Sequence, residues 1–188
     1  MKIFKTALIL SLLIGGTLVN VATIAPAFAD SANELNRQSQ QSLKMLLRDN
    51  SAARDLARTA KAILIFPRIT KAGLVFGAAF GEGELTENGK PTAYFNSFTG
   101  SWGLQAGAQS YGYVVFLMNE KAVDYIHNTD GWEFGIGPTI VLVNQGMAAN
   151  LSTSTAQDDA YAFIYNQQGL MAGLGIEGTK ITRIHPKK

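Results

Sequence analysis

The sequence predicts an α+β domain in which a leading amphipathic helix, or two, packs on a mostly antiparallel, strongly curved or barrel-like sheet of about eight strands. Residues 31–61 contain no Gly or Pro and are rich in good helix formers. From Ala62 onward, short apolar or alternating runs are separated by turn residues, which is typical of strands. No low-complexity linker divides residues 30–188, so we expect a single domain there.

Residues 1–29 have the composition of a secretory signal peptide. Lys2 and Lys5 give a positive start, an apolar run follows, and Ala27 and Ala29 offer small side chains to a signal peptidase. We therefore expect cleavage after Ala29 and a periplasmic or secreted mature chain. The apolar run is short for a membrane span and no second long run follows it, so no transmembrane segment is expected in the mature chain.

The helical region is expected to break near Asp49, Asn50 and Ser51, which form a plausible stop and a new N-cap. On a helical wheel the apolar side chains gather on one side and the basic side chains on the other. The apolar side holds Leu35, Met45, Leu46, Ala53, Leu56, Ala57 and Ala60. The basic side holds Arg37, Lys44, Arg48, Arg54, Arg58 and Lys61.

The later elements follow from turn residues and periodicity. Pro67 is expected to end the first strand because it has no N–H to donate, and Asn88-Gly89 is a strong hairpin signal. Strands are predicted over 63–66, 73–80, 92–98, 102–118 (one bent strand or two), 132–136, 139–143, 160–165, 169–177 and 180–184, with a short helix over 119–127 capped by Asn119.

One short phrase, Gly-Leu-x-x-Gly, occurs three times, beginning at Gly73, Gly103 and Gly169. If each phrase is an extended strand, its two glycines point to one face and leave that face bare. We therefore expect structural glycines in a small curved sheet, with another segment close to the bare faces. A ligand that approaches the backbone is the alternative.

The charge is unevenly distributed. The leader holds two of the sixteen Lys and Arg residues, so the mature chain has fourteen basic and fourteen acidic residues and is formally neutral. Residues 42–75 nevertheless carry seven basic residues against Asp49 and Asp55 alone. A basic surface beside an apolar stripe is typical of peripheral proteins that hold anionic headgroups. A helix that simply packs on the sheet, with a solvated basic face, is the competing interpretation.

The residues of enzyme and metal sites are scarce. The chain has no cysteine, which excludes disulfides, thiolate metal sites and a lipoprotein anchor. His127 and His185 have no recognisable catalytic setting, and neither cofactor nor metal is expected. The carboxylate pairs Glu82 with Glu84 and Asp158 with Asp159 are interpreted as solvated loop charge.

Phosphate-binding loops are excluded by spacing. The segment from Gly83 to Lys90 has the wrong interval for a P-loop, and Pro91 stands where Ser or Thr is needed. Pro138 follows Gly135 and Gly137 where a dinucleotide fingerprint would open a helix. Nucleic acid is not expected as a partner because the mature chain is neutral and exported.

The order and spacing of several motifs resemble the SYLF domain family over about residues 46–183. The motifs are Ala62-Ile63-Leu64-Ile65-Phe66-Pro67 with Lys71-Ala72-Gly73 and Gly77, Gly103-Leu104-Gln105-Ala106-Gly107, Gly137-Pro138, and Gly169-Leu170-Met171-Ala172-Gly173 with Gly178. The resemblance implies binding of phosphoinositides or other anionic lipids without catalysis, and actin-binding and endocytic roles in yeast relatives. For an exported bacterial member of the family, the resemblance implies only generic lipid binding and not the actin-related roles.

The sequence therefore predicts a non-enzymatic domain that binds anionic lipid surfaces. The candidate headgroup contacts are Lys44, Arg48, Arg54, Arg58, Lys61, Arg68 and Lys71. Trp102 or Trp132 are candidate interfacial anchors if they are exposed. The alternative is a binding or scaffolding module for an envelope protein, which uses a sheet edge or groove and has no lipid affinity. Hydrolysis through His127 is a third and weakly supported class.

Overall fold

The computed structural model describes residues 31–73, 76–102, 107–129, 131–152, 154–169 and 178–187. Within these ranges the elements are α1 (Ala32–Asp49), α2 (Ser51–Thr59), β1 (Ala62–Gly73), β2 (Phe76–Glu87), β3 (Lys90–Trp102), β4 (Gly107–Leu117), α3 (Glu120–Asn128), β5 (Gly131–Glu133), β6 (Ile140–Leu142), α4 (Gln145–Ala148), β7 (Ala160–Gly169) and β8 (Lys180–Ile184).

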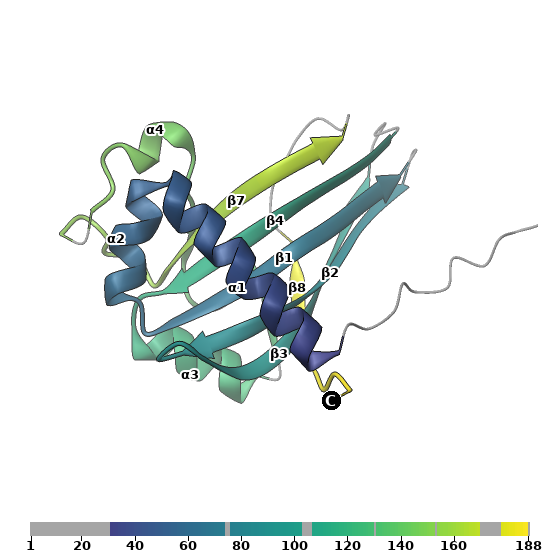
Figure 1. The fold of residues 1–188 in the computed structure, drawn as a ribbon, viewed down its shortest axis with the longest axis horizontal. Helices are drawn as coiled ribbons and strands as arrows, with labels where there is room; N and C mark the ends of the chain where they lie inside the picture. Colours follow the sequence, from purple (N-terminus) through teal and green to yellow (C-terminus); the bar gives the residue numbers. More distant parts are fainter. Residues whose placement is uncertain are drawn as a thin grey trace, which may run out of the picture.

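The strands form one eight-stranded sheet in the order β5-β8-β3-β2-β1-β4-β7-β6. All pairings are antiparallel except that of β6 with β7. Figure 1 shows the sheet strongly curved, with α1 lying across it and α2 at one end of α1. The predicted α+β class, the leading helices and the curved, mostly antiparallel sheet are confirmed.

The two faces of the sheet bury different side chains, because successive residues of a strand point to opposite sides. On β1, Ile65 packs in the cluster that includes Leu46 and Leu56 of the leading helices. Leu64 and Phe66 pack in the other cluster, with Ile126 of α3. We call these two sides the α1 face and the α3 face.

The helix boundaries follow from capping side chains. The Asn50 side chain accepts from the Ala53 N–H, so the predicted break between the two leading helices is confirmed. The Asn119 side chain accepts from the Ala122 N–H at the start of α3, as expected. Helix α4 was not predicted, although Asn144 caps it in the same way.

The predicted end of the first strand was wrong. Pro67 does not end a strand: β1 continues to Gly73, and its register with β4 shifts between Phe66 and Ile69. A β-bulge leaves a residue out of the hydrogen-bond ladder, so a proline without an N–H is tolerated there even in a central strand. Asn88 and Gly89 form the predicted hairpin turn, with φ of 50° and 73°.

The first glycine phrase does not lie within one strand. Gly73 ends β1, Gly77 lies in β2, and the two residues are partners across the β1–β2 hairpin. A Cβ on Gly73 would lie 2.5 Å from the Cα of Gly77, so the close approach of the two backbones requires glycine here. The second phrase lies between the end of β3 and Gly107, and the third begins at Gly169, the last residue of β7. Residues 74–75, 103–106 and 170–177, which hold the rest of the three phrases and the strand expected over 169–177, lie outside the described residues.

Candidate functional site

The corner between α1 and α2 is formed by one residue. The Asn50 N–H donates to the carbonyl of Leu46 at 2.9 Å, and the Asn50 side chain accepts from the Ala53 N–H at 2.9 Å. Asn50 therefore closes one helix and opens the next. The chain turns sharply without Gly or Pro, which brings the end of α1 and the start of α2 together.

Four of the predicted cations gather around this corner. Lys44 and Arg48 are four residues apart on α1, and Arg54 and Arg58 are four residues apart on α2, so each pair shares a helix face. The Arg54 guanidinium donates to the carbonyl oxygens of Leu47 at 2.6 Å and Arg48 at 2.9 Å, which links the two pairs. We call Lys44, Arg48, Arg54 and Arg58 the corner cluster.

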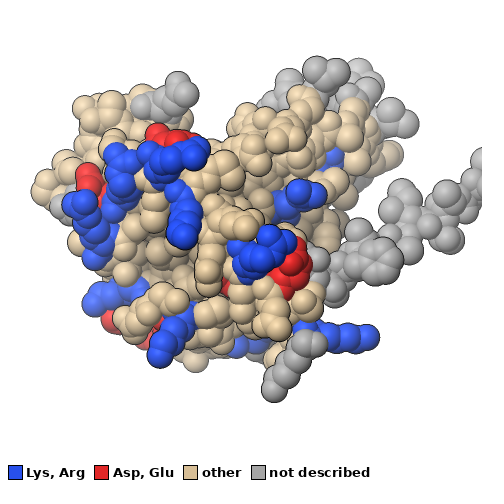
Figure 2. All heavy atoms as spheres, viewed as in Figure 1, with Lys and Arg blue, Asp and Glu red and all other residues tan. Residues whose placement is uncertain are grey.

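Carboxylates neutralise the corner cluster only in part. Arg48 contacts Asp49 at 2.7 Å and Arg58 contacts Asp55 at 3.5 Å, and all four side chains are exposed. The Arg48 guanidinium holds the pKa of Asp49 below its usual value. Exposed ion pairs of this kind contribute about 0–1 kcal/mol, so an incoming phosphate can displace them. Figure 2 shows Lys and Arg side chains grouped over α1 and α2, with few acidic side chains among them.

The other three predicted cations lie elsewhere. Lys61 contacts Glu120 of α3 at 3.3 Å. Arg68 lies in the β1 bulge and is exposed. Lys71 is the register partner of Ala79 on β2 and of Gln109 on β4, and both of these partner residues are buried. The structure thus brings together four of the seven predicted residues.

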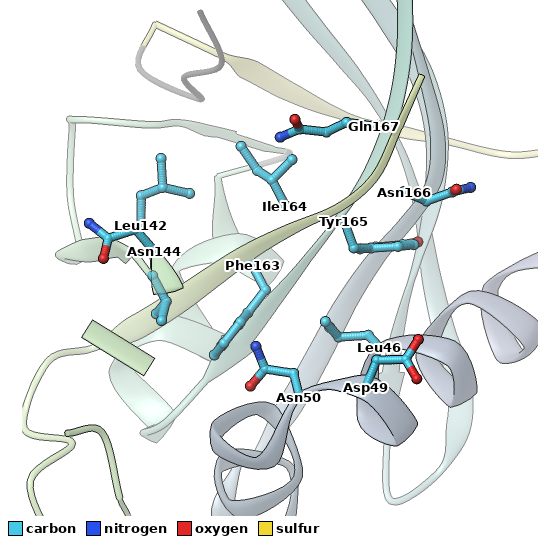
Figure 3. Close-up of a pocket in the computed structure, with 11 residues that line it drawn as sticks. Leu46, Asp49, Asn50, Leu142, Asn144, Phe163, Ile164, Tyr165, Asn166 and Gln167 are labelled. Atoms are coloured by element: carbon cyan, nitrogen blue, oxygen red, sulfur yellow. The ribbon is translucent and has the colours of Figure 1, made fainter. Parts of the chain in front are cut away.

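An apolar pocket adjoins the corner. It has a volume of about 560 Å³ and lies between the end of α1, the end of β6 and the middle of β7. Figure 3 shows side chains from these three elements arranged around it. The apolar walls are Leu46, Leu142, Val143, Phe163, Ile164 and Tyr165, and the polar ones are Asp49, Asn50, Asn144, Asn166 and Gln167. We call this the corner pocket.

A second, polar pocket of about 510 Å³ lies beside the middle of α1. Arg37 and Arg68 both line it, but Arg37 forms an ion pair with Glu34, which also lines it. Gln38, Gln41 and Ser110 supply further polar groups. Arg68 therefore faces a hydrophilic hollow that is separate from the corner cluster.

The buried Glu84 was missed by the sequence analysis, which treated it as solvated loop charge. Glu84 lies on β2, between Ile65 and Tyr94 of the neighbouring strands, and is fully buried. Neither carboxylate oxygen has a hydrogen-bond partner among the described residues, and the same is true of the buried Ser39 hydroxyl on α1. Burial raises the pKa of Glu84 to about 7. Glu82 points to the same face of β2, and no signal in the sequence indicates that Glu84 is buried while Glu82 is only half-buried.

Asp159 is also not simple loop charge. Its carboxylate accepts from the Asn119 amide, from the Lys121 ammonium and from the Thr139 N–H, each at 2.9 Å. These donors hold the pKa of Asp159 well below its usual value. The interaction ties the start of α3 to the start of β7, so the role of Asp159 is structural.

His127 and Trp132 are both tied into the fold. His127 Nε2 lies 2.8 Å from Glu87 and its Nδ1 lies 3.2 Å from Arg183, so both ring nitrogens are engaged. A general base needs a free nitrogen to take a proton from a nucleophile. Trp132 is buried, and its indole N–H donates to the carbonyl of Ile136 at 2.9 Å, so it is a core residue and not an interfacial anchor. The Trp102 side chain lies outside the described part of the structure.

In the part of the chain that the structure describes, no three His, Asp or Glu side chains gather to hold a metal ion. Among the described helices, none combines the length and apolar character needed to cross a bilayer.

Residues 98–185 match the family model described as "Ysc84: Las17-binding protein actin regulator". This segment matches the Ysc84, or SYLF, family. The resemblance seen in the sequence is thereby confirmed, and it identifies a binding domain of a lipid- or actin-related kind. None of the curated proteins compared with the chain matches it.

The SYLF match covers only part of the site. It includes the β6 and β7 walls of the corner pocket but not α1 and α2, which carry the corner cluster. The pocket wall is therefore a feature of the matched segment, while the cations come from the segment before it.

Proposed function

We propose that this protein is a non-enzymatic, exported domain that binds anionic lipid headgroups at a membrane surface. The observation that supports this function is the corner cluster, in which four cations meet two exposed carboxylates. Each basic residue close to an anionic membrane contributes about 1 kcal/mol. The phosphate or phosphoinositide-like headgroup binds by exchange with the weak surface ion pairs, so no step of bond chemistry is required.

The experiment is vesicle binding with a matched pair of charge variants. Lys44→Gln, Arg48→Gln and Arg58→Gln together remove three corner cations but keep Arg54, which bonds the end of α1. The expected result is a loss of about 3 kcal/mol, or roughly a hundredfold in partitioning onto anionic vesicles. Binding of the unaltered protein should also weaken as salt rises and as the anionic lipid content falls.

The control removes the same charge elsewhere. Lys90, Lys180 and Lys187 are exposed and lie outside the corner cluster, so their joint replacement by Gln should leave most of the vesicle binding. Equal loss in both triple variants, or binding that ignores both salt and lipid charge, contradicts the proposal. Circular dichroism of both variants verifies the fold.

A protein-binding function is the second candidate. The family description names a protein ligand, Las17, for its members. An envelope protein that binds this chain would co-purify with it while the chain shows no vesicle affinity.

Export is part of the proposal and has its own test. If residues 1–29 are removed on secretion, the mass of the protein recovered from the periplasm or medium corresponds to a chain that begins at Asp30.

A further inference from the structure

We infer that the corner pocket takes one acyl chain of an anionic lipid while the lipid's headgroup rests on the corner cluster. This inference rests on the proposed function and adds to it: the protein holds a single lipid molecule in a built site, in addition to its attraction to a charged surface.

The pocket has the size and lining of a small-molecule site. Its volume of about 560 Å³ falls within the range of about 300–1,000 Å³ that is usual for ligand pockets. Leu46, Val143, Phe163 and Tyr165 line it from the α1 face, while Leu142 and Ile164 border it from the other side of β7 (Figure 3). An apolar hollow of this kind favours the hydrocarbon part of an amphiphile.

Two of the pocket walls are held in place before any ligand arrives. The ring of Phe163 packs edge-on against Phe116 at 5.6 Å between ring centres. The ring of Tyr165 lies over Gly112, where a Cβ would meet it at 2.4 Å, and its hydroxyl donates to the carbonyl of Phe66. A preformed wall reduces the ordering cost of binding.

Charge at the pocket favours an anionic headgroup over a neutral one. Asp49 lines the pocket, but its carboxylate is already bonded by Arg48. No ion pair of Lys44 or Arg54 is present among the described residues. A phosphate beside Asn50 would therefore meet a net positive corner, with the hydrocarbon chain directed toward Leu46 and Phe163.

The neighbouring sheet edge is a poor template for a peptide. Strand β6 pairs with β7 only as far as Ala162, which leaves the outer edge of 163–165 open in the described structure. At Asn166 the backbone has a φ of 52°, and nearby the register of β7 with β4 shifts between Ser110 and Gly112. Strands in globular proteins are most often about five or six residues long, which is more than this open run offers. The short open edge therefore favours a lipid chain over a peptide strand in this pocket.

The pocket also has room to continue. A third hollow, of about 480 Å³, shares Asn144 with the corner pocket. Val141, Met147, Leu151 and Tyr161 line it. A chain too long for the corner pocket can pass Asn144 toward this apolar hollow.

The test is a chain-length series measured by calorimetry. The probes are single-chain phosphatidylglycerols whose acyl chain lengthens stepwise, used below the concentration at which they form micelles. Affinity should increase about fourfold for each added methylene until the pocket is full, and then level off. An affinity that does not depend on chain length overturns the inference.

Pocket-filling variants locate the binding. Leu46→Trp and, separately, Val143→Trp each place a larger ring where a buried side chain of the α1 face lines the pocket. Each should weaken the longest probe roughly tenfold, since the space for several methylenes is lost. The matched control is Ile136→Trp, at an exposed residue that does not line the pocket. Unchanged affinity in both folded pocket variants, or equal loss in the control, overturns the inference.

Vesicle binding separates this inference from the proposed function. The pocket variants should keep their salt-dependent attraction to anionic vesicles, which depends on the corner cluster. If the protein binds anionic vesicles but its affinity for the probes does not change with acyl-chain length, the proposed function stands and the pocket assignment is wrong. If an extended peptide binds instead and protects the amides of 163–165 from hydrogen exchange, the pocket is a protein site and the acyl-chain assignment is wrong.

Discussion

The two faces of the sheet are built differently. On the α3 face, aromatic rings form a chain of contacts: Phe66 stacks on Tyr113 at 4.6 Å, and Trp132 meets Phe134 at 5.5 Å. The buried Tyr113 hydroxyl donates to Ser97 at 2.7 Å. On the α1 face lie the Leu46 and Phe163 side of the corner pocket and a buried carboxylate without a described partner, Glu84. The α3 face is filled by stacked aromatic rings, whereas the α1 face leaves an open pocket and an unpartnered buried carboxylate.

The largest expected effect is the loss of packing on the α3 face. Phe66→Ala removes a fully buried ring from the aromatic stack, and should lower the free energy of unfolding by about 3–5 kcal/mol. Urea denaturation followed by circular dichroism measures this change. Phe98→Ala is the matched control, because this ring is 51% exposed and its loss should change stability by less than about 1 kcal/mol. Similar losses in both variants would remove the proposed contrast between core and surface.

A smaller effect, which depends on pH, is expected from the α1 face. The pKa of Glu84 is raised from 4.5 to about 7 in the folded protein, so the folded state holds a proton that the unfolded state releases between these pH values. Stability should therefore fall as pH rises through this window, by about 2 kcal/mol, and stay lower above it. Glu84→Gln should be more stable than the native protein at pH above about 7 and should lose this dependence.

Denaturation midpoints on both sides of this window measure the Glu84 effect. Glu133→Gln is the control, because the exposed Glu133 on β5 has no buried charge to relieve. A native protein whose stability is flat between mildly acidic and mildly alkaline pH would show that Glu84 is solvated or paired.

The smallest effect concerns the corner itself. Asn50→Ala removes the side-chain cap of α2 and should cost about 1 kcal/mol of stability. Because the cap fixes the angle at which the two pairs of cations meet, vesicle binding should weaken by a few-fold while the charge is unchanged. Asn128→Ala, at an exposed residue of α3, should alter neither quantity. If the Asn50→Ala variant keeps its full affinity for vesicles, the net charge of the corner cluster and not its arrangement attracts the lipid.

Local signals in the sequence predicted most of the architecture. Periodicity and caps predicted the paired helices, α3 and the Asn88-Gly89 hairpin, since these depend on neighbouring residues. The run of β1 through Pro67 was not predictable in this way, because the bulge is set by pairing with a distant strand, β4. The first glycine phrase was predicted as one strand for a related reason: a close hairpin and a bare strand face require glycine at the same spacing.

The candidate site was predictable only in its residue types. The basic helix face could be recognised from the sequence, but the grouping of Lys44, Arg48, Arg54 and Arg58 depends on the sharp corner at Asn50. The corner pocket combines α1 with β6 and β7, which are far apart in the chain. No periodicity within one segment indicates such a pocket, and none distinguishes the buried Glu84 from the half-buried Glu82.

The edges of the sheet have a consequence for crowded conditions. The outermost strands, β5 and β6, are each only three residues long. These short strands, and the irregular backbone at Asn166 where β7 extends past β6, offer another copy of the chain little regular length to pair with. Molecules gathered on a two-dimensional surface collide far more often than in bulk solution. If the protein gathers on a membrane as proposed, its blunt edges should limit strand pairing between copies at high density.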